Sequence, residues 1–231
     1  QSKAIKLGIS ETVVEEVMSS AKFLPKVIEY DRYQPEFYED TFTYIKKRSS
    51  KRKIKEGKKL FSKEKIIIEN IEKDFQVEKE LLLALMGIET NFGKYLGKMD
   101  IISSLATLSF DKRRSEFFTE ELLILLKLVD KKIIDKNILY GSWAGAFGNF
   151  QLMPRTIRNY AIDYNNNKTI ELKNNPKAAI IIPDKDIIPG AETLSPAYII
   201  FENYEKILNW NRSLRFALAV CTLKESFKNE I

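Results

Sequence analysis

The sequence has no histidine and only one cysteine, which excludes several kinds of catalytic site and metal site. Without histidine there can be no Ser-His-Asp or Cys-His catalysis and no histidine metal site. With Cys221 alone there is no internal disulfide and no thiolate metal cluster, and its apolar surroundings predict a buried packing residue. Any catalysis must therefore use carboxylates, hydroxyls, amides or the backbone.

Long apolar runs are also missing, so no transmembrane helix is predicted. The chain opens at Gln1 without a methionine or an apolar leader, from which we expect that a signal peptide has been removed. The 231 residues, 44% of them hydrophobic, suffice for one sizeable core or two modest ones.

The formal net charge is +6, and much of the excess lies in residues 46–59, where nine of fourteen are Lys or Arg. An anionic partner is one interpretation of such a cluster. Aromatic residues are not interleaved with the charges, which argues against single-stranded nucleic acid. A solvated basic surface is the favoured interpretation, with contact to an anionic polymer as the alternative.

The apolar pattern is mostly helical and predicts a mainly α chain. Helices are predicted after Ser10, from Pro35, after Ser62, and over residues 77–89, 114–129 and 211–227. The buried positions expected in three of these helices are Phe37, Phe42, Ile45, Phe118, Leu122, Leu125, Leu126, Phe216, Val220 and Leu223. Only residues 178–182 and 198–201 resemble strands, and the Asn- and Lys-rich stretch 163–176 is predicted to be a loop.

Glu89 is the strongest catalytic candidate on physical grounds. It follows Leu82, Leu85 and Met86 at the spacing of one helix face, so the pattern places a carboxylate among apolar residues. Gly93 then ends the helix. Burial and the negative end of the helix dipole would both raise the pKa of this carboxyl, as a general acid requires. A structural Glu paired with an Arg is the alternative.

Residues 141–154 form the second candidate site and contain three of the nine glycines of the chain. Such a density of glycine indicates close approach by a ligand or by another backbone. Ser142 and Gln151 offer hydrogen bonds, and Trp143, Phe147 and Phe150 offer flat apolar faces, a combination that suits a carbohydrate. Tight packing between two helices is the competing interpretation.

A calcium loop is the third candidate. Asp163, Asn165 and Asn167 hold the first, third and fifth positions of an EF-hand-like pattern. Lys168 replaces the turn glycine, and Asn174 replaces the bidentate Glu. These departures predict poor affinity for calcium, so we expect no required cofactor.

Four segments in this order resemble the lytic murein transglycosylase B family. They are residues 87–93, residues 105–110 with Arg113 and Arg114, residues 141–154, and residues 160–163. The resemblance implies an α-rich, lysozyme-like fold and a periplasmic enzyme of a Gram-negative bacterium that acts on peptidoglycan as a monomer. It implies a domain formed by residues 1–165 and 198–231, with residues 166–197 as a small loop and β-containing segment. The sequence departs from the family after Pro176, where the helix that closes the groove has no counterpart, so either the groove is shortened or the sequence omits residues.

The resemblance also implies a mechanism with one carboxylate. Glu89 would protonate the oxygen between N-acetylmuramic acid and N-acetylglucosamine, then accept the proton of the muramic 6-hydroxyl, giving a 1,6-anhydromuramoyl end. No second acid is expected in a comparable apolar setting, in contrast to ordinary glycosidases. The residues that would bind the substrate are Ser142, Gln151, Arg113, Arg114, Tyr160, Trp210 and Asn211. A hydrolase on the same scaffold and a non-catalytic glycan-binding module are the alternatives.

Overall fold

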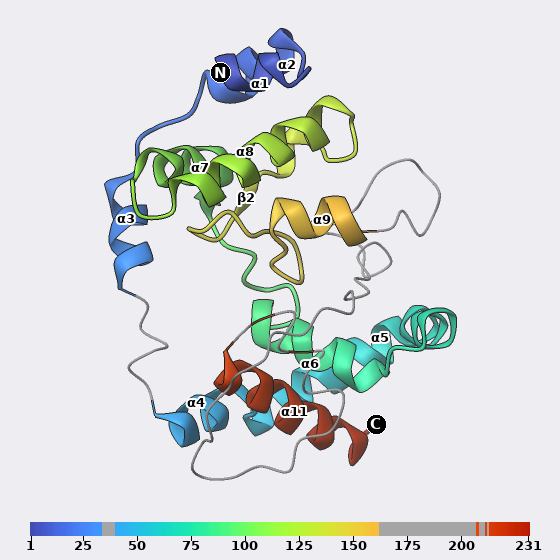
Figure 1. Ribbon diagram of the computed structural model, residues 1–231. Helices are drawn as coiled ribbons and strands as arrows, with labels where there is room; N and C mark the ends of the chain where they lie inside the picture. The colour runs from blue at the N-terminus through green and yellow to red at the C-terminus, as the bar shows by residue number, and fades with distance from the viewer. Residues whose placement is uncertain (34–39, 162–206, 208–210, 212) are drawn as a thin grey trace, which may run out of the picture. The chain divides into compact units, whose positions relative to one another are not determined.

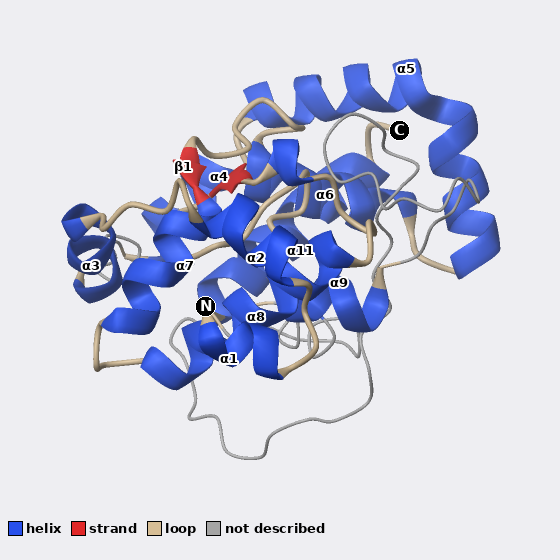
Figure 2. Cartoon of the chain, turned by 90° about the horizontal axis from the view of Figure 1, so that it is seen from above, coloured by secondary structure: helices blue, strands red, loops and turns tan. Residues whose placement is uncertain are grey.

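The computed structural model describes residues 1–33, 40–161, 207, 211 and 213–231 (Figure 1). Helices dominate this part of the chain and the strands are very short (Figure 2), which confirms the mainly α prediction. The chain divides into two compact units, one formed by Gln1–Tyr38 and Glu89–Ile181 and the other by Glu39–Ile88 and Ile182–Ile231. The sequence did not indicate this division. None of the described helices combines the length and apolar character needed to cross a lipid bilayer.

The first unit is built around two helices, α7 and α8, which pack side by side (Figure 1). Its elements are α1 Ser2–Lys6, α2 Glu11–Met18, α3 Pro25–Arg32, β1 Met99–Asp100, α7 Ile101–Phe110, α8 Ser115–Asp130, the 3-10 helix Lys136–Ile138, β2 Tyr140–Gly141 and α9 Pro154–Tyr160. The helices α2 and α9 pack on α8, and α3 packs on α7. The strands β1 and β2 form an antiparallel pair, with Met99 opposite Gly141.

The core of this unit follows the predicted periodicity of α8. Phe118, Leu122, Leu125 and Leu126 are all buried, as predicted. Helix α7 begins where the Asp100 carboxylate accepts a hydrogen bond from the backbone N–H of Ser103 at 2.6 Å, which caps the helix. The cap fixes the start of α7, whose buried side chains complete the core.

The helix predicted after Ser10 is α2, but Ser10 does not cap it through its side chain. Its hydroxyl instead donates to the carboxylate of Asp130 at 2.5 Å, at the end of α8. The residue thus starts one helix and ties it to another.

The second unit contains α4 Thr41–Arg48, α5 Lys51–Phe75, the part of α6 Lys79–Thr90 up to Ile88, and α11 Leu214–Lys228. Helix α11 packs on α4 and α5, and it buries Phe216, Val220 and Leu223 as predicted. Asn211 lies before this helix and accepts a hydrogen bond from the backbone N–H of Ser213, the residue that caps it. Cys221 is half-buried rather than fully buried, and burial raises the pKa of its thiol.

The helix starts predicted at Pro35 and Ser62 do not coincide with the starts of the described helices. Residues 34–39, including Pro35 and Phe37, lie outside the described residues, and α4 begins after Asp40, whose carboxylate accepts from the N–H of Thr43 at 2.9 Å. In consequence Phe42 is 72% exposed, and Tyr44 is the buried residue of this helix. Ser62 lies inside α5, which starts eleven positions earlier and departs from helical geometry at Glu64.

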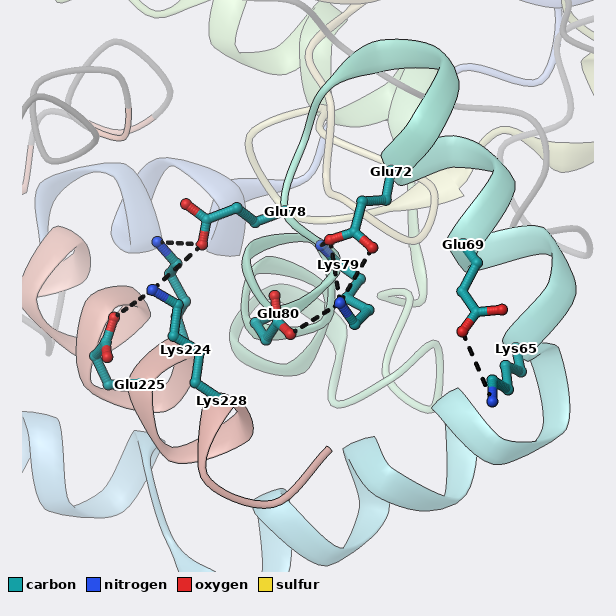
Figure 3. Close-up of polar contacts among 9 residues, drawn as sticks. All are labelled: Lys65, Glu69, Glu72, Glu78, Lys79, Glu80, Lys224, Glu225 and Lys228. Carbon is teal, nitrogen blue, oxygen red and sulfur yellow. Dashed lines mark hydrogen bonds and ion pairs between the residues drawn. The ribbon is translucent and has the colours of Figure 1, made fainter.

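Ion pairs fix the first turn of α6 within the second unit (Figure 3). Lys79 contacts the carboxylate of Glu72 on α5 at 3.1 Å and that of Glu80 at 3.2 Å. Glu78, just before the helix, contacts Lys224 of α11 at 2.7 Å. The Lys224 side chain is buried, whereas that of Glu78 is 38% exposed. The start of α6 is therefore held by both neighbouring helices.

The basic cluster of residues 46–59 falls on the end of α4 and the first half of α5. Lys51, Arg52, Lys55 and Lys59 are exposed, in keeping with a solvated surface. Lys53 is half-buried and donates to the carbonyl of Gly87 on α6. Lys58 pairs with Glu230 at 2.7 Å and Arg48 lies over the ring of Tyr44, so several members of the cluster have structural contacts.

Candidate active site

Glu89 lies in the last turn of α6, close to the predicted end of this helix. The most deeply buried positions of α6 include Leu83, Met86 and Thr90, whereas Glu89 is half-buried. The predicted face was thus slightly rotated, and the carboxylate lies at the border of the apolar face rather than in its middle. A half-buried carboxylate is partly desolvated and still accessible to a substrate.

A left-handed turn follows Glu89 directly. Asn91, Phe92 and Gly93 have φ angles of 50°, 60° and 77°; glycine and asparagine adopt this left-handed conformation readily, whereas a bulky residue such as Phe92 rarely does. Phe92 is buried, which anchors the turn. Each left-handed non-glycine residue costs about 1–2 kcal/mol, and such strain persists only where surrounding contacts impose it. The sequence analysis predicted the left-handed conformation at Gly93, the last residue of this turn, and not at the two residues before it.

The loop of residues 141–152 contacts this turn through side-chain hydrogen bonds. The hydroxyl of Thr90 donates to the carbonyl of Asn149 at 2.8 Å. The side-chain N–H of Gln151 donates to the carbonyl of Leu96 at 3.1 Å and to that of Gly148 at 3.0 Å. Gln151 itself has a positive φ of 49°. The structure therefore brings Gln151 and the Glu89 turn together, as the two motifs suggested.

Glycines in this loop, and Gly97 in the segment before β1, lie where a Cβ atom would collide with a neighbouring backbone or side chain. A Cβ atom on Gly97 would lie 2.1 Å from the carbonyl oxygen of Gly141, and one on Gly145 would lie 2.4 Å from Leu105 on α7. Both glycines also have positive φ angles. The close approach of Gly141 to the backbone at Gly97 agrees with the interpretation that another backbone lies close, and residues 142–153 form a loop rather than one of two packed helices.

Ser142 closes the tip of the loop. Its hydroxyl accepts from the backbone N–H of Ala146 at 3.0 Å, and its own N–H donates to the carbonyl of Ala146 at 2.8 Å. The side chain is half-buried, which leaves the hydroxyl proton available to a ligand. Phe147 and Phe150 are buried core residues, so the prediction that they offer faces to a sugar was wrong, while Trp143 is half-exposed.

Arg113 and Arg114 both bind the buried carboxylate of Asp31 at the end of α3. Arg113 contacts a carboxylate oxygen at 3.1 Å and donates to the backbone carbonyl of Asp31 at 2.5 Å, and Arg114 contacts the other oxygen. The Asp31 side chain is 1% exposed, whereas the two guanidinium side chains remain 48% and 38% exposed. The arginines therefore join α3 to the turn before α8 and keep part of their surface for another partner.

The expectation that no second acid occupies an apolar setting was wrong. Glu121 is 1% exposed on the inner side of α8, between Phe118 and Leu125. Burial raises the pKa of its carboxyl, although the backbone N–H and guanidinium of Arg155 act in the opposite direction. Arg155 contacts Glu121 at 3.1 Å and also pairs with Glu120. The helical spacing of Glu121 among apolar residues could have revealed it, but its Arg partner marks it as structural.

The remaining predicted residues lie at the end of α9, in the second unit, or outside the described residues. Tyr160 is the half-buried last residue of α9. Asn211 belongs to the second unit. Trp210, Asp163, Asn165 and Asn167 lie outside the described residues, as do both predicted strands. Within the described ranges, no group of three or more acidic, Cys or His residues is placed to hold a metal ion.

The fold and the site together define a class. An α-rich unit in which one carboxylate ends a helix beside a glycine-rich loop has the lysozyme-like fold of the lytic transglycosylases. SltB3 from Pseudomonas aeruginosa, solved in complex with NAG-anhNAM-pentapeptide, matches with a TM-score of 0.87 and 23% identity over 98% of this chain and 77% of that chain. Slt35 from Escherichia coli, solved with calcium, matches with a TM-score of 0.80 and 23% identity over 98% and 90% of the two chains.

The sequence matches the family described as Transglycosylase SLT domain over residues 1–182, and the chain therefore belongs to this family. Membrane-bound lytic murein transglycosylase B from Escherichia coli strain K12 is 38% identical over 99 residues. That alignment covers 42% of this chain and 27% of the relative, so it spans about a quarter of the curated protein's length. The resemblance seen in the four sequence segments is confirmed.

Proposed function

We propose that this protein is a peptidoglycan lytic transglycosylase that cleaves the β-1,4 bond between N-acetylmuramic acid and N-acetylglucosamine. The observation that carries the proposal is the half-buried Glu89 at the end of α6, followed by a left-handed turn bonded to the loop of Ser142 and Gln151. Family membership and the SltB3 complex with NAG-anhNAM-pentapeptide support it. The protein would act in the periplasm, where peptidoglycan is located.

In the proposed reaction, Glu89 donates its proton to the glycosidic oxygen as the bond to the muramic anomeric carbon breaks. The resulting carboxylate then accepts the proton of the muramic 6-hydroxyl, whose oxygen attacks that carbon and forms the 1,6-anhydro ring. The proton lost by Glu89 is regained and no water is consumed. One carboxylate therefore serves as acid and then as base, which requires partial desolvation but no second acid.

The loop supplies groups for binding. The Ser142 hydroxyl already accepts a bond from Ala146 and can donate to a sugar oxygen. The side-chain N–H groups of Gln151 bond to the backbone, which leaves its amide oxygen as the group for a sugar hydroxyl. The exposed surfaces of Arg113 and Arg114 would contact the lactyl or peptide part of the substrate. Tyr160, Trp210 and Asn211 complete the proposed binding set.

The test is mass spectrometry of purified sacculi digested by the wild type, by Glu89→Gln and by the control Glu15→Gln. Glu15 is an exposed acid on α2, so the control matches the change in charge. Anhydromuramoyl products from the wild type and the control, but not from Glu89→Gln, are expected. Reducing ends would instead identify a hydrolase. Binding to sacculi without products from any variant would identify a glycan-binding module.

We further propose that the reaction needs no calcium and that the protein acts as a monomer. The degenerate pattern starting at Asp163 lacks both the turn glycine and the bidentate Glu of a calcium loop. Activity should therefore be unchanged after treatment with EDTA. Loss of activity that calcium restores would contradict this, and light scattering after gel filtration measures the oligomeric state.

A further inference from the structure

Thr90 is the last residue of α6 and directly follows Glu89. Its side chain is fully buried, and its hydroxyl makes two hydrogen bonds to the backbone. It donates to the carbonyl of Asn149 at 2.8 Å and accepts from the N–H of Gly93 at 2.9 Å. A hydroxyl can do both because it is a donor and an acceptor at once.

The bond to Gly93 closes the left-handed turn. The backbone carbonyl of Thr90 also accepts from the N–H of Tyr95 at 2.9 Å, so both polar groups of this residue hold the segment that follows it. The φ angle of Phe92 is unfavourable for a bulky side chain and needs such contacts to be maintained. Without the hydroxyl, the left-handed turn that ends α6 would lose one of the hydrogen bonds that stabilise it.

The bond to Asn149 reaches the loop that carries Ser142 and Gln151. Asn149 is itself buried, so its carbonyl needs a partner away from water. The bond from Gln151 to Leu96 is a second connection between the same two segments. The Thr90 hydroxyl lies nearer to Glu89 along the chain than this second connection does, and it is the one that touches both the turn and the loop.

We propose that Thr90 is a positioning residue, whose hydroxyl sets the place of the Glu89 carboxylate relative to the Ser142 and Gln151 loop. This inference rests on the proposed catalytic role of Glu89. A displacement of about 1 Å in a reacting group can cost about 100-fold in rate. The loss would fall mainly on kcat, because the bonds of Gln151 to Leu96 and Gly148 and the bond from Ala146 to Ser142 still hold the groups that bind the substrate.

The experiment compares Thr90→Val, Thr90→Ser and a matched control, Thr107→Val, on a soluble glycan-peptide oligomer. Thr107 is also buried in the first unit, and its hydroxyl accepts from the N–H of Leu24 at 3.0 Å and donates to the carbonyl of Lys22 at 3.4 Å. Valine removes equivalent bonds at both positions. Each variant is assayed well below its own unfolding midpoint, so that only folded protein is compared.

We expect Thr90→Val to lower kcat about 100-fold with KM changed by less than about threefold. Thr90→Ser keeps the hydroxyl and should restore most of kcat, and Thr107→Val should lose stability while retaining activity. Equal kcat values for Thr90→Val and Thr107→Val, or no rescue by serine, would overturn the inference. An inactive wild type would instead overturn the proposed function, so the two failures are distinguishable.

Discussion

Gly97→Ala should destabilise the protein much more than Gly8→Ala, although both glycines have nearly the same backbone conformation. Their φ angles are 84° and 79°, so an alanine at either position bears the same left-handed strain. At Gly97 the new Cβ would lie 2.1 Å from the carbonyl oxygen of Gly141, whereas at Gly8 nothing lies within 4 Å. The difference between the two variants therefore isolates the clash.

The magnitudes follow from these two contributions. The left-handed conformation costs about 1–2 kcal/mol, and the lower entropy of the unfolded alanine chain returns about 0.4–1 kcal/mol. Gly8→Ala should therefore lose about 1 kcal/mol of unfolding free energy. Overpacking adds about 1–3 kcal/mol at Gly97, where the obstacle is backbone and must itself move. Gly97→Ala should lose about 2–4 kcal/mol.

The assay is urea unfolding followed by tryptophan fluorescence in a Trp210→Phe background. The chain has two tryptophans, so the signal then reports Trp143 in the same unit as both glycines. Midpoints convert to free energies through the slope m, which should not change. Gly97→Ala should also lower lytic activity, because Gly141 precedes Ser142. Equal losses of stability for the two variants would refute the reasoning from the close approach of Gly97 to Gly141.

Three further predictions concern buried charges. Asp31→Asn should lower the free energy of unfolding by about 1–3 kcal/mol, since the Asp31 carboxylate is buried against Arg113 and Arg114; a loss below about 0.5 kcal/mol in urea unfolding would contradict this. For Glu121 the raised pKa means that the folded state binds the proton more tightly than the unfolded state does, so the free energy of unfolding falls as pH rises above the unfolded pKa of about 4.3. The difference between the stability–pH curves of the wild type and Glu121→Gln should show this fall. A difference that does not change with pH would contradict the prediction. For Glu78 burial acts to raise the pKa, but Lys224 and Lys228 outweigh it, so the pKa of this carboxyl is lowered. The wild type should therefore have a higher free energy of unfolding than Lys224→Met at neutral pH, and this difference should vanish as pH falls below about 4. A difference that persists in acid would mean that Lys224 acts through packing alone.

Helix periodicity was enough to predict the inner helices of both units. The buried positions of α8 and α11 were predicted residue by residue, because an apolar stripe that recurs with the helical period has one stable way to be buried. Starts of helices were less predictable. Ser62 resembles a cap, yet α5 begins at Lys51 and the nearest departure from helical geometry is at Glu64, since a serine inside a helix gives the same local signal as one in front of it.

The candidate site could be predicted at the level of its residues and only in part at the level of its geometry. The position of Glu89 near the end of α6 followed from spacing and Gly93. The left-handed conformation of Phe92 could not be predicted, because it is imposed by the bond from Gly93 to Thr90 and by burial of Phe92 rather than by local preference. The buried Glu121 was missed because its partner, Arg155, lies thirty-four residues away on another helix.

The connection from α6 to β1 has a consequence for changes in chain length. Segments between elements usually accept inserted or deleted residues, since their backbone faces water. Here the hydroxyl of Thr90, the carbonyl of Leu96 and the backbone at Gly97 are each matched to a fixed partner in the loop of residues 141–152. Adding or removing one residue between Asn91 and Leu96 would misalign these partners, so among natural relatives and in mutant libraries this connection should have one allowed length.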